Sequence, residues 1–103
     1  MISKLPGDWM RVKVNYKAVA ITVDCYVRYV GHSDASWTQF STIETDENIP
    51  YIERQLIDQI QLPWELEIGT YGLQFLFVPR VEGMSDVIMN MPNELKILQS
   101  GPM

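Results

Sequence analysis

Hydrophobic and polar residues alternate along residues 9–30, and strict alternation of this kind predicts β-strands with one buried face. The apolar side chains occupy even positions over residues 10–16 and odd positions over residues 19–29. Because one extra residue swaps the two faces of a strand, the change of phase near residues 17–20 predicts either a turn or a bulge. We favour two long strands of one sheet, joined by a turn at residues 15–18. A single bulged strand stays open, since no Asn-Gly or Asp-Gly pair marks that turn.

Four further strands are predicted from β-branched and aromatic residues that lie between turn signals. The first of them carries polar residues on both faces and is therefore expected at the edge of the sheet. The third is apolar on both faces apart from Gln74 and is expected to be the most buried strand. The predicted strands cover residues 36–43, 64–68, 73–78 and 87–91, with turns at residues 31–34, 69–72 and 82–86.

One amphipathic helix is predicted over residues 49–62. Asn48 or Asp46 can cap its first backbone N–H groups, and Pro50 suits the first turn. Pro63 ends the helix, because the residue before a proline avoids the helical region. The apolar positions 49, 52, 56, 57 and 60 form a stripe at helical spacing. A single amphipathic helix has to bury such a stripe, and the sheet is the only surface that can cover it.

Together these elements predict the α+β class: an antiparallel sheet of five to six strands with one amphipathic helix packed on one face, in the order β-β-β-α-β-β-β. A length of 103 residues predicts a single domain over residues 1–103 with one modest core. Residues 1–8 and 95–103 are expected to be short arms that would gain from packing on a neighbour. Residues 93–98 suit either one helical turn or a final strand.

The charge of the chain bears on the class of partner. Eight basic and thirteen acidic residues give a net charge of −5, and the basic residues are scattered. Binding to DNA or RNA requires clustered Lys and Arg, so we expect no direct contact with nucleic acid. Cys25 is the only cysteine and lies on the apolar phase of its strand, where we expect a buried, inert thiol. No signal peptide or membrane span is recognisable, which predicts a soluble, intracellular protein of the cytoplasm.

Residue types that carry chemistry occur in the chain, but their spacing favours structural roles. His32, Ser33 and Asp34 are the types found in a catalytic triad, yet a triad is assembled from separate segments, and beside a glycine these residues favour a turn. The acidic residues at 44–47 and at positions 65 and 67 lack the spacing of a calcium loop. We therefore expect no enzyme activity, no cofactor and no metal. A small enzyme with a pocket between helix and sheet is the least favoured hypothesis.

Aromatic and sulfur-containing side chains occur at positions that are not expected to be buried in the core. Such side chains are enriched at protein interfaces because they supply a large and adaptable contact area. The candidate interface residues are Tyr26, Tyr71, Met84, Met89 and Met91.

The favoured hypothesis is a non-enzymatic, small acidic protein-binding module that docks on a larger protein, in general character like the accessory or inhibitor proteins of phages and mobile elements. The alternative is a structural subunit of a homo-oligomeric assembly, such as a phage particle or tail component, in which strand edges and arms are exchanged between subunits.

Overall fold

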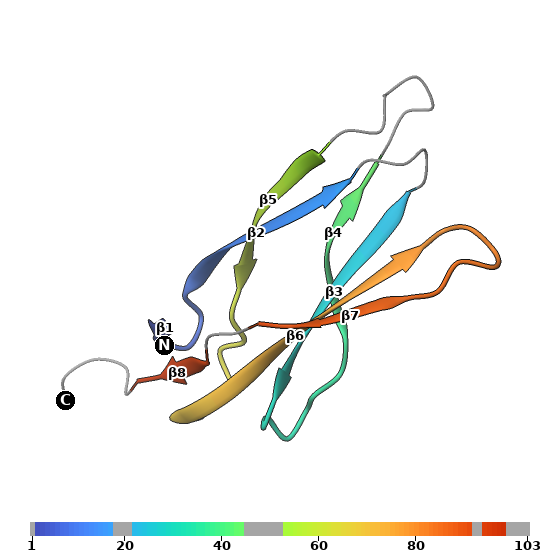
Figure 1. The fold of residues 1–103 in the computed structure, drawn as a ribbon. Coiled ribbons are helices and arrows are strands. Elements are labelled where there is room, and N and C mark those ends of the chain that lie inside the picture. Colours follow the sequence, from blue (N-terminus) through green and yellow to red (C-terminus); the bar gives the residue numbers. More distant parts are fainter. Residues whose placement is uncertain (1, 18–21, 45–52, 92–93, 99–103) are drawn as a thin grey trace.

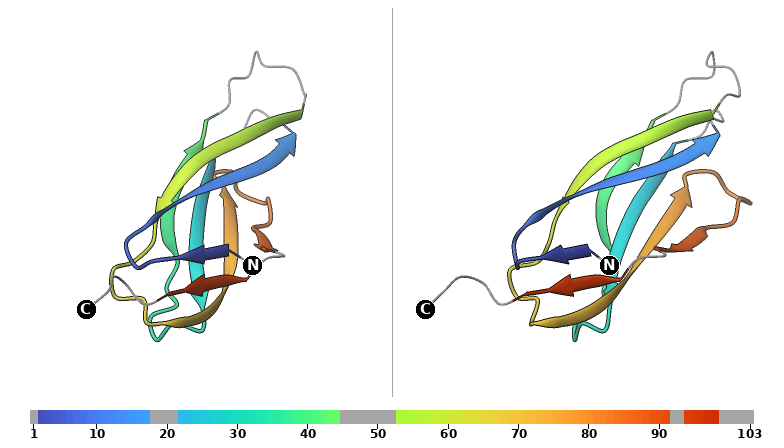
Figure 2. Two further views of the ribbon diagram at one scale, coloured as in Figure 1. Left: turned by 90° about the vertical axis from the view of Figure 1, so that its left-hand side faces the viewer. Right: turned by 60° about the vertical axis from the view of Figure 1, so that its left-hand side comes forward.

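The computed structural model describes residues 2–17, 22–44, 53–91 and 94–98, and all regular structure in these ranges is β-strand. The strands form two sheets that lie as two layers (Figures 1 and 2). The predicted α+β class is therefore wrong, and the described part of the chain is all-β. The strands are β1 (Ile2–Lys4), β2 (Trp9–Lys17), β3 (Val23–Val30), β4 (Thr38–Ile43), β5 (Glu53–Gln61), β6 (Gly69–Pro79), β7 (Val87–Asn90) and β8 (Leu95–Ile97).

The larger layer is a six-stranded sheet in which β1, β8, β6, β3 and β4 lie side by side in that order and β7 also pairs with β6. Residues 69–71 of β6 pair with β8 and residues 74–77 pair with β7, whereas residues 72–79 pair with β3 along the opposite edge. The second layer is the antiparallel pair of β2 and β5, which lies over the larger sheet in Figure 2. The long strand β6 is thus central, as its apolar sequence predicts.

The core lies between the two layers, because the strands of both layers carry apolar side chains at every second position. The buried hydrophobic residues are Met10, Val12, Cys25, Val27, Tyr29, Ile43, Ile60, Leu62, Leu66, Tyr71, Leu73, Phe75, Phe77, Leu95 and Ile97. The alternation over residues 9–30 is confirmed as two strands, β2 and β3, but they belong to different sheets. They are not the two arms of one hairpin, and residues 18–21 between them lie outside the described residues.

The predicted helix is the main error, since residues 53–61 form strand β5 in antiparallel register with β2. Leu56 and Ile60 are four residues apart, a spacing that puts two side chains on one face of a helix and also on one face of a strand. Ile57 separates the two structures: a helical stripe would bury it, whereas a strand turns it outward, and it is 52% exposed. Residues 53–61 pair with residues 9–17 of β2 along their whole length, and such pairing is possible only for a strand. Residues 49–52 of the predicted helix lie outside the described residues.

Strand β4 is at the edge of the larger sheet, as predicted, and a β-bulge explains its mixed faces. Cys25 pairs with Ser41 but the next residue of β3 pairs with Gln39, so Phe40 has no partner in the ladder. The extra residue turns Phe40 toward the core, where its ring meets Phe75 edge to face with 5.8 Å between the ring centroids.

The strand predicted at residues 64–68 and the turn predicted at residues 69–72 are both wrong. Leu66 is buried, but no strand forms at residues 64–68, and Trp64 is exposed. β6 begins at Gly69 and continues through the predicted turn, because backbone pairing with β8 and β3 holds these residues extended.

The two predicted arms contain strands of the chain's own sheet. β1 pairs in parallel with β8, and β8 pairs with the start of β6, so residues 95–97 form the final strand that was one of the two alternatives. Leu95 and Ile97 have no exposed surface. Ile2, Leu95 and Ile97 therefore pack within this chain, whereas Leu5 and Leu98 are exposed. Residues 1 and 99–103 lie outside the described residues.

Cys25 and Tyr29 lie on the buried face of β3, and Cys25 is a free thiol. Burial disfavours the ionised forms, which raises the pKa of Cys25 from 9.0 to about 11 and that of Tyr29 from 10.0 to about 12. The folded state then holds these protons at a pH at which the unfolded state has lost them. Their contribution to stability is complete below the unfolded pKa values and declines as the pH rises above them.

We therefore expect the free energy of unfolding, measured with urea, to include a loss of about 1 kcal/mol between pH 8 and pH 10 that is due to the Cys25 thiol. The Cys25→Ala variant, although less stable at every pH, should lack this part of the decline. An equal decline in the two proteins would show that the buried thiol does not carry it.

Candidate functional site

The structure brings only two of the five predicted interface residues together. Met89 and Met91 line the same groove, and Met84 is exposed in the loop between β6 and β7. Tyr26 is half-buried on the opposite face of the larger sheet, where its cross-strand partners are Gln39 and Leu76.

Tyr71 does not lie at a turn tip as expected. It lies inside β6, is 7% exposed, and its hydroxyl donates a hydrogen bond of 2.8 Å to the backbone oxygen of Glu67. Tyr71 is therefore a core residue in the described structure and offers little surface to a partner.

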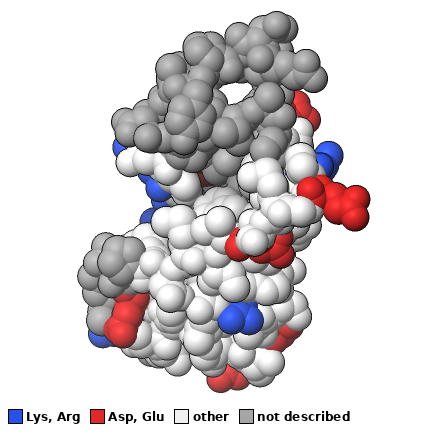
Figure 3. Space-filling model, turned by 45° about the vertical axis from the view of Figure 1, so that its right-hand side comes forward, with Lys and Arg blue, Asp and Glu red and all other residues white. Residues whose placement is uncertain are grey.

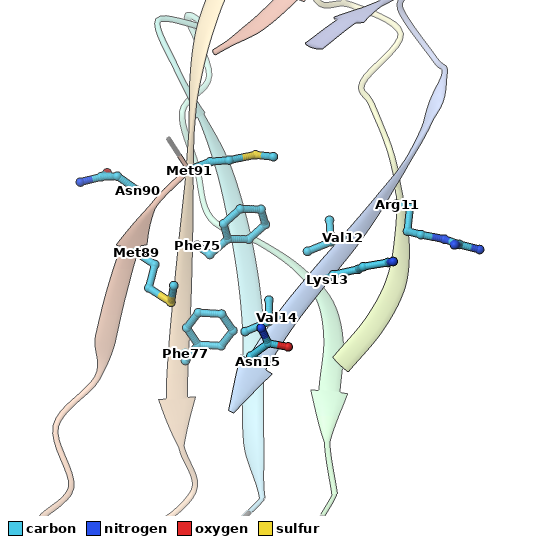
Figure 4. A pocket seen from close by; sticks show the side chains of 10 residues that line it. All are labelled: Arg11, Val12, Lys13, Val14, Asn15, Phe75, Phe77, Met89, Asn90 and Met91. Carbon is cyan, nitrogen blue, oxygen red and sulfur yellow. The ribbon is translucent and has the colours of Figure 1, made fainter. Parts of the chain in front are cut away.

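A groove of about 350 Å³ lies between β2 and the adjoining strands β6 and β7, and it is half-open to solvent (Figure 4). Its lining comes from one continuous run of β2 and from alternate residues of β6, together with the end of β7. The lining residues are Arg11, Val12, Lys13, Val14, Asn15, Phe75, Phe77, Met89, Asn90 and Met91.

The floor of the groove is apolar, because alternate residues of β2 and β6 face each other across it. Phe75 and Phe77 point from β6 toward β2 in Figure 4, and Val14 lies beside them. Val12 is buried, whereas Val14 is half-buried. The groove therefore exposes part of the core between the two layers at one side of the molecule.

One edge of β2 borders the groove with unpaired backbone groups. The N–H of Leu62 donates to the backbone oxygen of Asp8 at 2.8 Å, just beyond the first pair of the ladder. Hydrogen-bonded pairs alternate in an antiparallel ladder, so the even-numbered residues of β2 bond to β5. The N–H and C=O groups of Arg11, Lys13 and Asn15 then point away from β5. Among the described residues, no strand pairs with this edge.

Strand β7 lies on the other side of the groove, and among the described strands only β6 pairs with it, which leaves its second edge free. The N–H of Met91 donates to the backbone oxygen of Leu73 at 2.9 Å, so the same alternation turns the backbone groups of Ile88 and Asn90 away from β6. All four residues of β7 are exposed, with Ile88 at 58% and Met89 at 48%. An exposed apolar edge strand is a surface on which another strand can pair.

Positive charge is concentrated at the β2 rim of the groove. Arg11 and Lys13 are exposed, and their side chains point away from the two phenylalanines in Figure 4. Their cross-strand partners on β5 are Gln59 and Ile57, which are uncharged. No carboxylate is among the described residues that line the groove, and no described salt bridge involves either basic residue.

Outside the groove, the described salt bridge joins Arg80 and Asp24, which are far apart in the sequence. Arg80 holds Asp24 by two hydrogen bonds of 2.8 and 2.9 Å at the outer face of the larger sheet, and this bonding lowers the pKa of Asp24. On the face drawn in Figure 3, the coloured Lys, Arg, Asp and Glu side chains are scattered over a mainly uncharged surface.

The segment with the residue types of a triad is a turn, as predicted. Asp34 accepts hydrogen bonds from the backbone N–H and the hydroxyl of Ser36, which lowers the pKa of Asp34. The ring of His32 meets the ring of Tyr71 edge to face, with 6.3 Å between the centroids. Asp34 thus orders its own turn and does not orient the histidine.

The acidic residues that lack the spacing of a calcium loop are exposed to solvent where the structure describes them. Glu44, Glu65 and Glu67 are exposed, whereas residues 45–47 lie outside the described ranges. Within the described part of the chain, no group of three His, Cys, Asp or Glu side chains is placed to hold a metal ion.

Most of the groove could not be predicted from the sequence. Arg11, Lys13, Phe75 and Phe77 were assigned only to strand faces, since nothing in their pattern shows that β2 and β7 lie on either side of one opening. One signal was present: two basic residues on the polar phase of a strand in an acidic protein.

No helix in the described residues is long and apolar enough to span a membrane. Compared with protein families, curated proteins and solved structures, the chain matches none of them.

Proposed function

We propose that this protein is a non-enzymatic protein-binding module that holds an extended segment of a larger protein in the groove between β2 and β7, as an accessory or inhibitor protein can do. The observation that carries the proposal is the free edge of β2 beside an apolar floor of Phe75 and Phe77. Strand addition uses these two features together, since main-chain hydrogen bonds supply affinity and pockets for alternate side chains supply specificity.

The side chains of the groove support binding rather than acid–base or nucleophilic catalysis. The polar groups among its described lining are Arg11, Lys13, Asn15 and Asn90, and the other lining residues are apolar. General bases and nucleophiles are usually His, Asp, Glu, Ser, Cys or Lys side chains. Of these types the described lining holds Lys13 alone, which is exposed and points away from the apolar floor (Figure 4).

The proposal is tested by removing one backbone donor from the free edge of β2. The N–H of Lys13 points away from β5, so the Lys13→Pro variant should keep the ladder between β2 and β5 and lose a donor to the added strand. Peptides of about nine residues, selected from a random library on the wild-type protein, should bind Lys13→Pro about tenfold more weakly. Lys13→Ala, which keeps the N–H, is the matched control and should lose less affinity.

Two measurements accompany this test. Circular dichroism should show that Lys13→Pro keeps its strand content. The proposal is contradicted if no peptide is selected, or if the selected peptides bind Lys13→Pro as tightly as the wild type.

Self-assembly is the second candidate function, and the exposed apolar residues Val87, Ile88 and Met89 of β7 favour it. Light scattering on the same wild-type sample distinguishes the two functions, because a monomer near 11.9 kDa leaves the groove for another protein.

A further inference from the structure

We infer that the segment held in the groove carries acidic side chains alternating with apolar ones and pairs along the free edge of β2. This inference rests on the proposed function and adds the chemistry of the partner. It follows from the alternation of Arg11 and Lys13 with Val12 and Val14 along the edge that borders the groove.

The geometry of strand pairing sets which partner side chains meet which residues of β2. Residues opposite each other on neighbouring strands point to the same face of the sheet. Side chains opposite Val12 and Val14 would therefore point inward, over Phe75 and Phe77. Side chains opposite Arg11 and Lys13 would point to the outer face, beside two cations. The added strand then has one apolar face and one face that lies within reach of positive charge.

The positive charge of this rim is not neutralised within the described structure. On β5, the cross-strand and diagonal neighbours of Arg11 and Lys13 are all uncharged: Gln55, Ile57, Gln59 and Gln61. Opposite charges facing each other across two strands stabilise the pair, and like charges destabilise it. Since the chain as a whole has a net charge of −5, this basic rim is a local exception that selects carboxylates.

The same charges disfavour a second copy of this chain on the β2 edge. Pairing of β2 with β2 of another copy would place the basic side chains of both copies on one face, close to one another. The free edge of β7 does not select between acidic and basic partners, because its outward backbone groups belong to Ile88 and Asn90, which are uncharged.

The test uses two synthetic peptides of about nine residues, one alternating glutamate with valine and the other alternating lysine with valine. Fluorescence anisotropy should show that the glutamate peptide binds about tenfold more tightly than the lysine peptide, and that its affinity falls as the salt concentration rises. In the double variant Arg11→Glu, Lys13→Glu the preference should reverse. Lys96→Glu is the matched control for the single variant Lys13→Glu, because Lys96 is exposed on β8 and does not line the groove.

The possible outcomes test the acidic chemistry of the partner and the binding by strand addition separately. Equal binding of the two peptides, lost in Lys13→Pro, would overturn the acidic partner and leave strand addition in place. Binding of neither peptide would contradict both. An equal loss of affinity in Lys96→Glu and Lys13→Glu would attribute the preference to net charge and overturn the assignment to this rim. A wild-type dimer that becomes monomeric in Lys13→Pro would identify a second copy as the occupant and overturn the inference.

Discussion

The Leu95→Ala variant is expected to lose about 2–5 kcal/mol of the free energy of unfolding. Leu95 has no exposed surface, and it pairs with Tyr71 of β6 on one side and with Ile2 of β1 on the other. Truncation to alanine removes the buried methyl groups and leaves a cavity at the point where three strands meet. Since small domains have total stabilities of only about 5–15 kcal/mol, this loss is a large fraction of the whole. Urea denaturation of the two proteins measures it.

Lys96→Ala is the control for this variant, because Lys96 is the next residue of β8 and is exposed. Its effect should stay within about 0.5 kcal/mol. Similar effects of the two substitutions would show that β8 does not pack against β1 and β6 as described.

The burial of Leu95 and Ile97 also means that deletion of residues 95–103 removes part of the core. Such a deletion cannot serve as a selective probe of self-assembly.

The Ile60→Ala variant is expected to lose about 2–5 kcal/mol of the free energy of unfolding, whereas Ile57→Ala should lose less than about 1 kcal/mol. Ile60 is buried opposite Met10 in the ladder, and Ile57 is half-exposed on the outer face opposite Lys13. The comparison is matched, because both substitutions change the same residue type within one strand.

This pair of variants also distinguishes strand β5 from an amphipathic helix. A helix over the same residues would place Ile57 and Ile60 on one buried stripe, so the two losses would be similar. Urea denaturation that gave equal losses would therefore contradict the pairing of β2 with β5.

The two layers have one side beside β4 and β5, where a pocket of about 220 Å³ lies, and another side beside β2 and β7, where the groove lies. β4 and β5 are in contact along the first side, whereas the groove lies between β2 and β7 along the second. A free strand edge invites pairing with other copies, and natural proteins protect such edges with charge or by keeping the strand short. Arg11 and Lys13 protect β2 in this way, and β7 has only four residues. The same two charges that discourage self-association then provide selectivity for an acidic strand.

Much of the strand content could be predicted from the sequence. The period-two pattern predicts β2 and β3, the apolar run of residues 73–78 predicts a central β6, and the short β7 was expected within a residue of its bounds. The burial of Cys25 followed from its phase on β3. These predictions succeed because alternation is a local property: a strand with one buried face has to place apolar residues at every second position, whichever strand lies beside it.

By itself, then, the sequence determined which faces of the strands β2 and β3 are apolar, and it placed Arg11 and Lys13 on the polar phase of β2. Only the tertiary structure decided that residues 53–61 form a strand. The spacing of Leu56 and Ile60 suits both a helix and a strand, and the antiparallel pairing with β2 distinguishes the two. It also decided that β2 and β7 border one opening. The physical reason is that pairing partners are chosen by contacts between distant segments, and such contacts leave no signature in local periodicity.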